Sequence, residues 1–183
     1  MMRMRLFGIL LASSVAIAGI ATSAALAQQG QQQPISALKG HDSSAPVDVS
    51  ADRLEVQDRS DRAVFAGNVH VKQGDLALDT ERLTVAYSGN AGVQIRRLDA
   101  AGGVVVHSPS ETARGDFGIY DLDRKLITLI GNVELTRENN RIGGARLVID
   151  LDSGRAVIDG GPPGVNSSGG RVSGHFTVPQ KRQ

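Results

Sequence analysis

Apolar residues recur at every second position through most of this chain, and that alternation is the feature that most restricts its fold. In FAGNVHV (residues 65–71), Phe65, Val69 and Val71 share one parity, and in LITLIGNVEL (residues 126–135) Leu129 and Val133 do the same. No stretch between residues 47 and 160 shows the i, i+3, i+4, i+7 spacing of an amphipathic helix. Turn signals such as QGD, SGN, ENN and DSG cut the runs. The pattern predicts an all-β sandwich, roll or barrel.

The chain also repeats itself. A shift of 64 residues aligns residues 51–87 with residues 115–151 without a gap, so that Asp52 meets Asp116 and the Gly-Asn-Val of residues 67–69 meets that of residues 131–133. A shift of 29 matches DRLEV (residues 52–56) with ERLTV (residues 81–85) and relates YDLDRKLITLIG (residues 120–131) to IDLDSGRAVIDG (residues 149–160). Periodic strand units of this kind stack so that each buries its neighbour's apolar face.

Within each unit the alternation slips by one residue. Apolar positions change parity near residues 79–82, again at residues 143–144, and at the start between Val49 and Leu54. A slip turns side chains to the other face unless a bulge or bend re-aims the strand. We therefore expect bends at these places, bulges at the Gly-Asn pairs of residues 67–68 and 131–132, and long strands that contribute to two packed walls.

The first residues have the layout of an export signal. MMRMR is basic, residues 6–20 are apolar, and Ala-Leu-Ala at residues 25–27 offers a cleavage site. The alternative is an uncleaved membrane anchor, because the apolar stretch extended to Leu26 has about the 20 residues that span a bilayer. The sequence thus predicts a cleaved signal peptide (1–27), a flexible N-terminal segment (28–46), one β-domain (47–160) and a disordered tail rich in Gly, Pro and Ser (161–183).

Charge and cysteine content narrow the function. Without Arg3 and Arg5, 18 of the 20 basic residues remain against 19 acidic ones, which gives the exported chain a net charge of −1. Such a chain lacks the basic field through which proteins bind nucleic acid. It contains no cysteine, so it must hold its fold by burial and backbone pairing, which fits a protein of the bacterial periplasm.

The sequence offers no constellation for catalysis, a metal ion or a cofactor. His41 and His175 lie in the flanking segments. His70 alternates with valines and should face solvent, while His107 precedes Ser-Pro in an expected loop. No cluster has metal-ligand spacing, and the Asp-Leu-Asp motifs at residues 121–123 and 150–152 lack the other ligands of a calcium loop, which favours hairpin carboxylates. We expect no catalytic residue and no enzymatic activity.

Three segments together give a specific resemblance. ADRLEVQDRSDRAVFAGNVHVKQGDLALDTERLTVAY (residues 51–87), YDLDRKLITLIGNVEL (residues 120–135) and GARLVIDLDSGRAVIDGG (residues 144–161) resemble the LptA/OstA-like family. The resemblance implies a slightly twisted, V-shaped open β-jellyroll of antiparallel strands with an apolar groove. It implies a periplasmic carrier that moves lipopolysaccharide from the inner to the outer membrane, with the lipid A acyl chains in the groove. It also implies end-to-end homo-oligomers that join an inner-membrane LptC-like jellyroll protein to an outer-membrane LptD-like jellyroll domain.

The candidate lipid-facing residues are the apolar members of the inward faces. They are Phe65, Val69, Val71, Leu78, Leu83, Val85, Leu129, Val133, Leu135, Leu147 and Ile149. Two other functions fit the same pattern. One is an LptC-like member of the same pathway that keeps its N-terminal anchor, and the other is a structural β-roll that binds no lipid.

Overall fold

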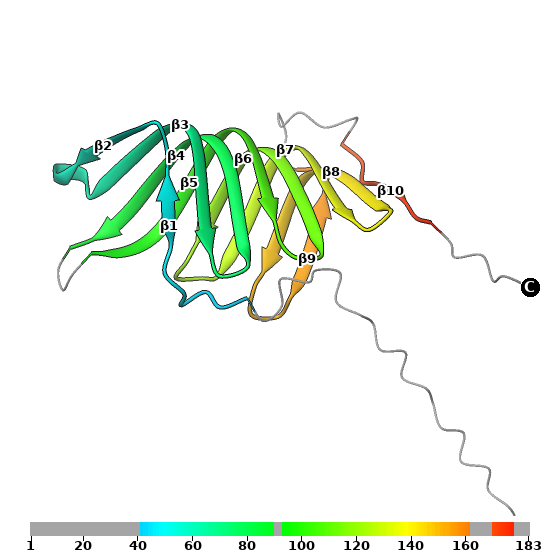
Figure 1. The fold of residues 1–183 in the computed structure, drawn as a ribbon. Coiled ribbons are helices and arrows are strands. Elements are labelled where there is room, and N and C mark those ends of the chain that lie inside the picture. The colour runs from blue at the N-terminus through cyan, green and yellow to red at the C-terminus, as the bar shows by residue number, and fades with distance from the viewer. Residues whose placement is uncertain (1–40, 90–92, 162–169, 178–183) are drawn as a thin grey trace, which may run out of the picture. The chain divides into compact units, whose positions relative to one another are not determined.

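The computed structural model describes residues 41–89, 93–161 and 170–177, which form one open sheet (Figure 1). The predicted signal peptide (1–27) and most of the predicted flexible segment (28–46) lie outside these residues. Among the helices of the described ranges, none has the length and apolar character to cross a membrane.

Ten strands and one short 3₁₀ helix, η1 (Asp58–Ser60), make up the described part of the chain. The strands are β1 (Asp48–Ser50), β2 (Arg53–Gln57), β3 (Arg62–Gln73), β4 (Leu76–Ser88), β5 (Gln94–His107), β6 (Glu111–Asp121), β7 (Leu126–Arg137), β8 (Asn140–Asp150), β9 (Arg155–Asp159) and β10 (Ser173–His175). Every pairing is antiparallel, and β3 to β8 follow one another in chain order. At one end both β1 and β2 pair with β3, and at the other both β9 and β10 pair with β8.

A row of register shifts crosses the sheet and divides it into two walls. The shifts fall at residues 67–68 in β3, 80–81 in β4, 102–103 in β5, 115–116 in β6 and 131–132 in β7. We call this row the crease. Wall 1 comprises β2, β9 and, between them, residues 62–66, 82–88, 94–101, 117–121, 126–130 and 146–150. Wall 2 comprises β1, β10 and residues 69–73, 76–79, 104–107, 111–114, 133–137 and 140–144.

A contact between aspartate, glycine and asparagine builds the crease twice. Asp52 Oδ2 accepts a hydrogen bond from Asn68 Nδ2 at 2.8 Å, and Asp116 Oδ2 accepts one from Asn132 Nδ2 at 2.9 Å. The glycine before each asparagine has a φ of +80° or +81°, a region that residues with a Cβ rarely adopt. A Cβ on Gly67 would lie 2.6 Å from the aspartate oxygen. The bulges predicted at both Gly-Asn pairs are therefore confirmed.

The repeat found in the sequence is a repeat of strands. Shifted by 64 residues, β3 coincides with β7, while β1 and β2 coincide with the two halves of β6 on either side of the crease. The predicted slip near residues 79–82 lies at the crease. The slip predicted at residues 143–144 lies next to it, since the crease crosses β8 between Gly144 and Arg146. At the start, the inward position passes from Val49 in β1 to Leu54 in β2 as the chain crosses from wall 2 to wall 1.

Two segments differ from the prediction. Residues 173–175, in the tail expected to be disordered, form β10 and pair with residues 141–143 of β8. An edge strand offers unpaired backbone groups that any short segment can satisfy, so β10 forms without the apolar alternation that would have marked it in the sequence. His107 is the last residue of β5 rather than part of a loop, because its backbone still pairs with Thr112.

Substitution of Gly67 or Gly131 in the crease should destabilise the protein, whereas substitution of a glycine outside the sheet should not. Gly131→Ala should lower the free energy of unfolding by about 2 kcal/mol, because alanine is strained at φ +81° and its Cβ would press on the Asp116 carboxylate. Gly89→Ala is the matched control, since a Cβ there meets nothing within 4 Å. Urea unfolding followed by circular dichroism measures both, and equal stabilities of the two variants would contradict the role given to the crease.

Candidate functional site

The inward faces of the two walls meet in one apolar interior. Nine of the eleven predicted residues are buried in a single hydrophobic cluster: Val69, Val71, Leu83, Val85, Leu129, Val133, Leu135, Leu147 and Ile149. Phe65 and Leu78 are partly buried and pack against that cluster. The fold therefore brings all eleven together, while their contact with lipid stays a prediction.

The central strands supply interior residues that the sequence analysis did not name. β5 and β6 contribute Leu98, Ala100, Val104, Val106, Ala113 and Tyr120. Leu98, Ala100, Val104, Val106 and Ala113 lie outside both aligned copies of the repeat, so the comparison between copies could not find them, whereas Tyr120 aligns with Val56. The available signal was the shared parity of Leu98, Ala100, Val104 and Val106 on both sides of a Gly-Gly pair.

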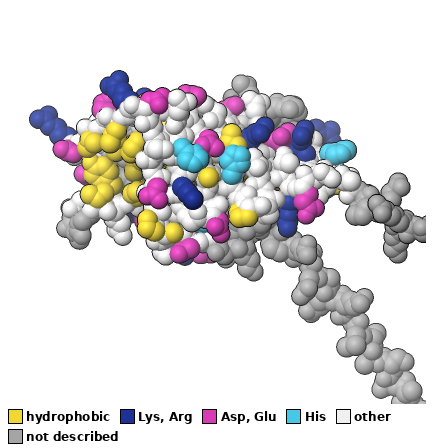
Figure 2. Space-filling model, in the orientation of Figure 1, with side chains coloured by type: hydrophobic (Ala, Val, Ile, Leu, Met, Phe, Trp, Pro, Cys, Tyr) yellow, Lys and Arg dark blue, Asp and Glu magenta, His cyan; other side chains and the backbone are white. Residues whose placement is uncertain are grey.

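At the N-terminal end the apolar face continues onto an exposed edge strand. Leu54 and Val56 of β2 pair opposite Phe65 and Ala63 of β3, so their side chains lie on the inward face. They are nevertheless 54 % and 56 % exposed. Figure 2 shows hydrophobic side chains gathered at the end of the molecule where β2 and β3 lie. The interior therefore opens, without a change in chemistry, onto an apolar surface at this end.

At the C-terminal end β9 extends the interior more completely. Ala156 and Ile158 pair opposite Ile149 and Leu147 and pack against the cluster. Asp159 closes this strand through an ion pair with Arg146 of β8, in which Oδ2 lies 2.6 Å from Nη2. Two groups lower the pKa of the Asp159 carboxyl: the Arg146 guanidinium and the backbone N–H of Gly161.

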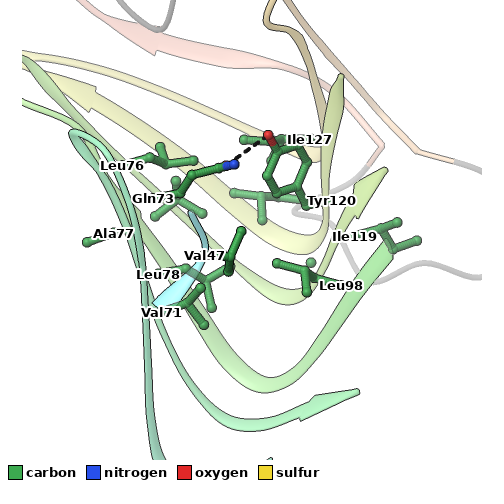
Figure 3. A pocket seen from close by; sticks show the side chains of 13 residues that line it. Val47, Val71, Gln73, Leu76, Ala77, Leu78, Leu98, Ile119, Tyr120 and Ile127 are labelled. Carbon is green, nitrogen blue, oxygen red and sulfur yellow. Dashed lines mark hydrogen bonds between the residues drawn. The ribbon is translucent and has the colours of Figure 1, made fainter. Parts of the chain in front are cut away.

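One small space between the two walls is lined by described residues of both. The space has a volume of about 20 Å³, room for one water molecule. Val47, Val71, Leu76, Leu98 and Ile127 are among the residues that line it, and they point toward one another from both walls in Figure 3. An acyl chain could lie here only if the walls moved apart.

One polar pair interrupts this apolar lining. Tyr120 of wall 1 donates a hydrogen bond from its hydroxyl to Oε1 of Gln73 in wall 2, at 3.0 Å (Figure 3). Both side chains are buried, with 5 % and 3 % of their surface exposed. Burial raises the pKa of Tyr120 to about 12, because the phenolate would lose its hydration. The pair joins the two walls far from the crease.

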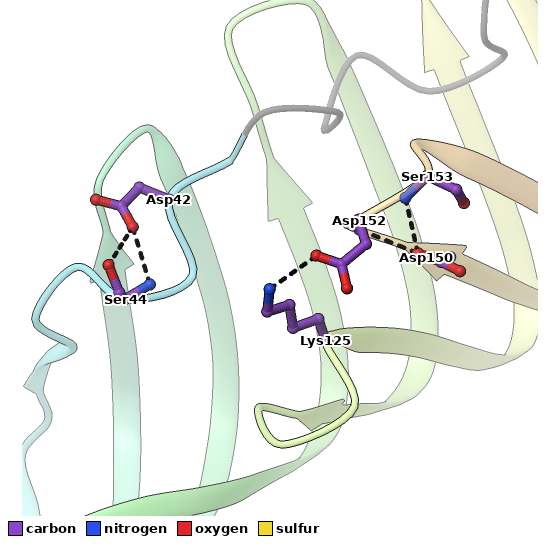
Figure 4. A network of polar contacts seen from close by, with 6 residues as sticks. All are labelled: Asp42, Ser44, Lys125, Asp150, Asp152 and Ser153. Carbon is purple, nitrogen blue, oxygen red and sulfur yellow. Dashed lines mark hydrogen bonds and ion pairs between the residues drawn. The ribbon is translucent and has the colours of Figure 1, made fainter.

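Polar side chains on the outer surface form hydrogen bonds and an ion pair at the hairpin turns. Asp150 Oδ1 accepts hydrogen bonds from the backbone N–H groups of Asp152 and Ser153, at 3.0 Å each, and these bonds lower the pKa of its carboxyl (Figure 4). Lys125 Nζ lies 2.8 Å from Asp152 Oδ1 and ties this hairpin to its neighbour. In the other Asp-Leu-Asp motif, Asp121 Oδ1 accepts from the backbone N–H of Arg124. Both motifs are hairpin carboxylates, as predicted.

Histidines cluster at one place on the outer face of wall 2. Asp79 contacts His70 through Oδ1 and His107 through Oδ2, and all three side chains are about half exposed. His70 Nδ1 and His107 Nε2 lie against different oxygens of the Asp79 carboxylate. Residues 41–89, 93–161 and 170–177 contain no group of His, Cys, Asp and Glu suited to hold a metal ion.

Comparisons with known proteins agree with this architecture. The sequence profile of the LptA/(LptD N-terminal domain) LPS transport protein family matches residues 48–155. The chain is 30 % identical to the uncharacterized protein R00383 of Rhizobium meliloti (strain 1021) over 171 residues, 88 % of each chain. It is 24 % identical to the lipopolysaccharide export system protein LptH of Pseudomonas aeruginosa, over 66 % of this chain and 70 % of LptH.

A solved structure confirms the fold. The crystal structure of LptH from Pseudomonas aeruginosa superimposes with a TM-score of 0.67 at 21 % identity, over 75 % of this chain and 99 % of that one. The predicted open, antiparallel β-jellyroll is thereby confirmed. The family profile covers more than half of the chain. The chain therefore belongs to the LptA/LptD N-terminal domain family of lipopolysaccharide transport proteins and is not an enzyme.

Proposed function

We propose that this protein is a periplasmic carrier of lipopolysaccharide that holds the lipid A acyl chains between its two walls. The observation that carries the proposal is the continuity of the apolar interior with the exposed inward face of β2. A multi-chain lipid cannot cross water unaided, because each methylene that is kept from water contributes about 0.8 kcal/mol. A trough of Val, Leu and Ile side chains shields methylenes without offering polar atoms.

Lipid would enter by parting the walls. The cavity of about 20 Å³ is far smaller than an acyl chain, and we propose that the closed interior is the lipid-free state. Across the interior the walls are held mainly by apolar contacts, which are not directional. An acyl chain offers each wall the same kind of apolar contact that the other wall does. Replacing wall–wall contacts by wall–lipid contacts therefore changes the free energy little. The continuous backbone pairing along each wall can persist while the crease opens.

The two ends of the sheet are the proposed joints of a bridge. In the described residues β2 pairs only with β3, and β9 only with β8, so each leaves one edge of backbone groups for another chain. Addition of a related edge strand is an established mode of recognition. We propose end-to-end contacts with further copies of this chain, with an inner-membrane LptC-like jellyroll and with an outer-membrane LptD-like jellyroll domain.

The proposal differs from its alternatives in measurable ways. An LptC-like anchored protein would keep residues 1–27, and N-terminal sequencing of the mature protein decides this point. A structural β-roll would carry no lipid, whereas a carrier purified from its own cell envelope should release lipopolysaccharide that mass spectrometry detects. The name of LptH, described as a periplasmic component of a lipopolysaccharide transport device, supports the carrier.

Photo-crosslinking should distinguish the inward from the outward face. A photo-reactive amino acid at Phe65 or Leu135 should form adducts with lipopolysaccharide in living cells, because both positions face the interior. The same probe at His70 or Glu134, which face outward from the same two strands, is the control. Adducts are read by immunoblotting against lipopolysaccharide, and equal labelling from both faces would refute the proposed groove.

Charges on the open edge should weaken end-to-end association. Leu54→Glu and Val56→Glu each place a carboxylate on the exposed apolar face of β2, and burying it at a joint would be costly. Thermal stability should change little, because both side chains are more than half exposed. Sedimentation velocity measures the loss of oligomers, with the outward-facing Glu55→Gln as control. Unchanged oligomers in both glutamate variants would exclude this edge as a joint.

A further inference from the structure

Gln73 is a buried amide whose hydrogen-bonding capacity is fully used. Its Oε1 accepts from the Tyr120 hydroxyl at 3.0 Å and lies 3.1 Å from His41 Nε2. Its Nε2 donates to the backbone carbonyls of Ser43 and Ala45, at 3.0 Å each. Two acceptor sites and two N–H donors are all that a glutamine side chain has. One residue at the tip of wall 2 therefore binds wall 1 on one side and residues 41–45 on the other.

Residues 41–47 run over this tip as a short strap. An Asx turn shapes it, since Asp42 Oδ1 accepts hydrogen bonds from both the backbone N–H and the hydroxyl of Ser44 (Figure 4). The strap passes over the β3–β4 turn, where a Cβ on Gly74 would lie 4.0 Å from that of Ala45. Its last residue, Val47, lines the space between the walls (Figure 3).

These contacts oppose opening in a way that the apolar lining does not. An acyl chain can replace wall–wall contacts between Val, Leu and Ile side chains, but it cannot replace the bonds of an amide. If the walls part with the strap in place, the Tyr120 bond is lost. If the strap leaves, the two N–H groups of Gln73 lose their acceptors. A buried polar group without a partner is unfavourable, so the Tyr120 bond favours closed walls, and the bonds of Gln73 hold the strap, with Val47, over the space between them.

We propose that residues 41–47 act as a strap that must be released from Gln73 before the interior can admit acyl chains. The inference rests on the proposed lipid-carrying function and adds a step that controls opening, because Gln73 binds both the strap and Tyr120, and the strap ends at Val47, which lines the space between the walls. The strap precedes β1 directly, so a partner that engages the N-terminal edge could displace it.

A reversible disulfide tests the strap. The chain has no cysteine of its own, and the 4.0 Å between the Cβ positions of residues 45 and 74 suits a disulfide. Ala45→Cys combined with Gly74→Cys should, when oxidised, take up fluorescently labelled lipopolysaccharide at least about tenfold more slowly than the wild type, and reduction should restore the rate. The two single-cysteine variants are controls. Equal uptake by the oxidised and reduced forms would overturn the proposal.

A second variant pair keeps the test independent of that disulfide. Tyr120→Phe removes only the hydroxyl that reaches Gln73 and should speed uptake several-fold, whereas Tyr87→Phe, the other tyrosine of the chain, should leave it unchanged. Equal rates in both variants would exclude the Gln73–Tyr120 bond from the control of opening.

The lipid-free protein provides the readout that separates the two proposals. If no variant binds lipopolysaccharide, the carrier function is refuted. Amide hydrogen exchange then tests, without lipid, whether the strap restrains the two walls. Exchange in residues 69–73 and 117–121 should be slower in the oxidised double-cysteine protein than in the reduced one, because a fixed strap holds Gln73, and through it Tyr120, in place. Identical exchange in the two forms would overturn the strap.

Discussion

The crease is the constraint on which the rest of this structure depends. A sheet of strands 11 to 14 residues long would present one flat apolar face to water if nothing bent it. The bulges turn each long strand so that both of its halves face the same interior. The hydrogen bond from asparagine to aspartate and the positive φ of the preceding glycine fix the bend at Gly67 and again at Gly131. Burial of the apolar faces follows from this local geometry.

Much of this architecture could be predicted because it rests on local rules. Alternation by two gives strands, a change of parity gives a bend, and the spacing of Gly-Asn pairs gives the repeat. The inward residues of β3, β4, β7 and β8 were found in this way, since both copies of the repeat contain them. β10 was not predicted, because three exposed residues that pair by their backbone leave no hydrophobic signal. The Gln73–Tyr120 bond joins residues 47 positions apart, and no local pattern indicates such a contact.

The interior combines two kinds of interaction with different consequences. Apolar contacts between the walls are non-directional, which suits the proposed exchange of wall–wall contacts for contacts with a lipid. The polar contacts at Gln73 are few and directional, and they hold the strap in one place. A carrier built only from the first kind would have no defined closed state. If the walls were joined mainly by polar contacts, parting them would cost more free energy than lipid binding could offset.

Comparison of the two copies of the repeat separates the residues that the fold needs from those proposed to control parting of the walls. Both copies keep the aspartate, glycine and asparagine of the crease, because each copy needs the bend. They do not keep the polar pair: Arg137 occupies the position equivalent to Gln73, and Val56 the position equivalent to Tyr120. Val56 lies on the edge strand β2 and is 56 % exposed. The Gln73–Tyr120 contact is therefore confined to one place, at the ends of β3 and β6 far from the crease and next to the strap (residues 41–47).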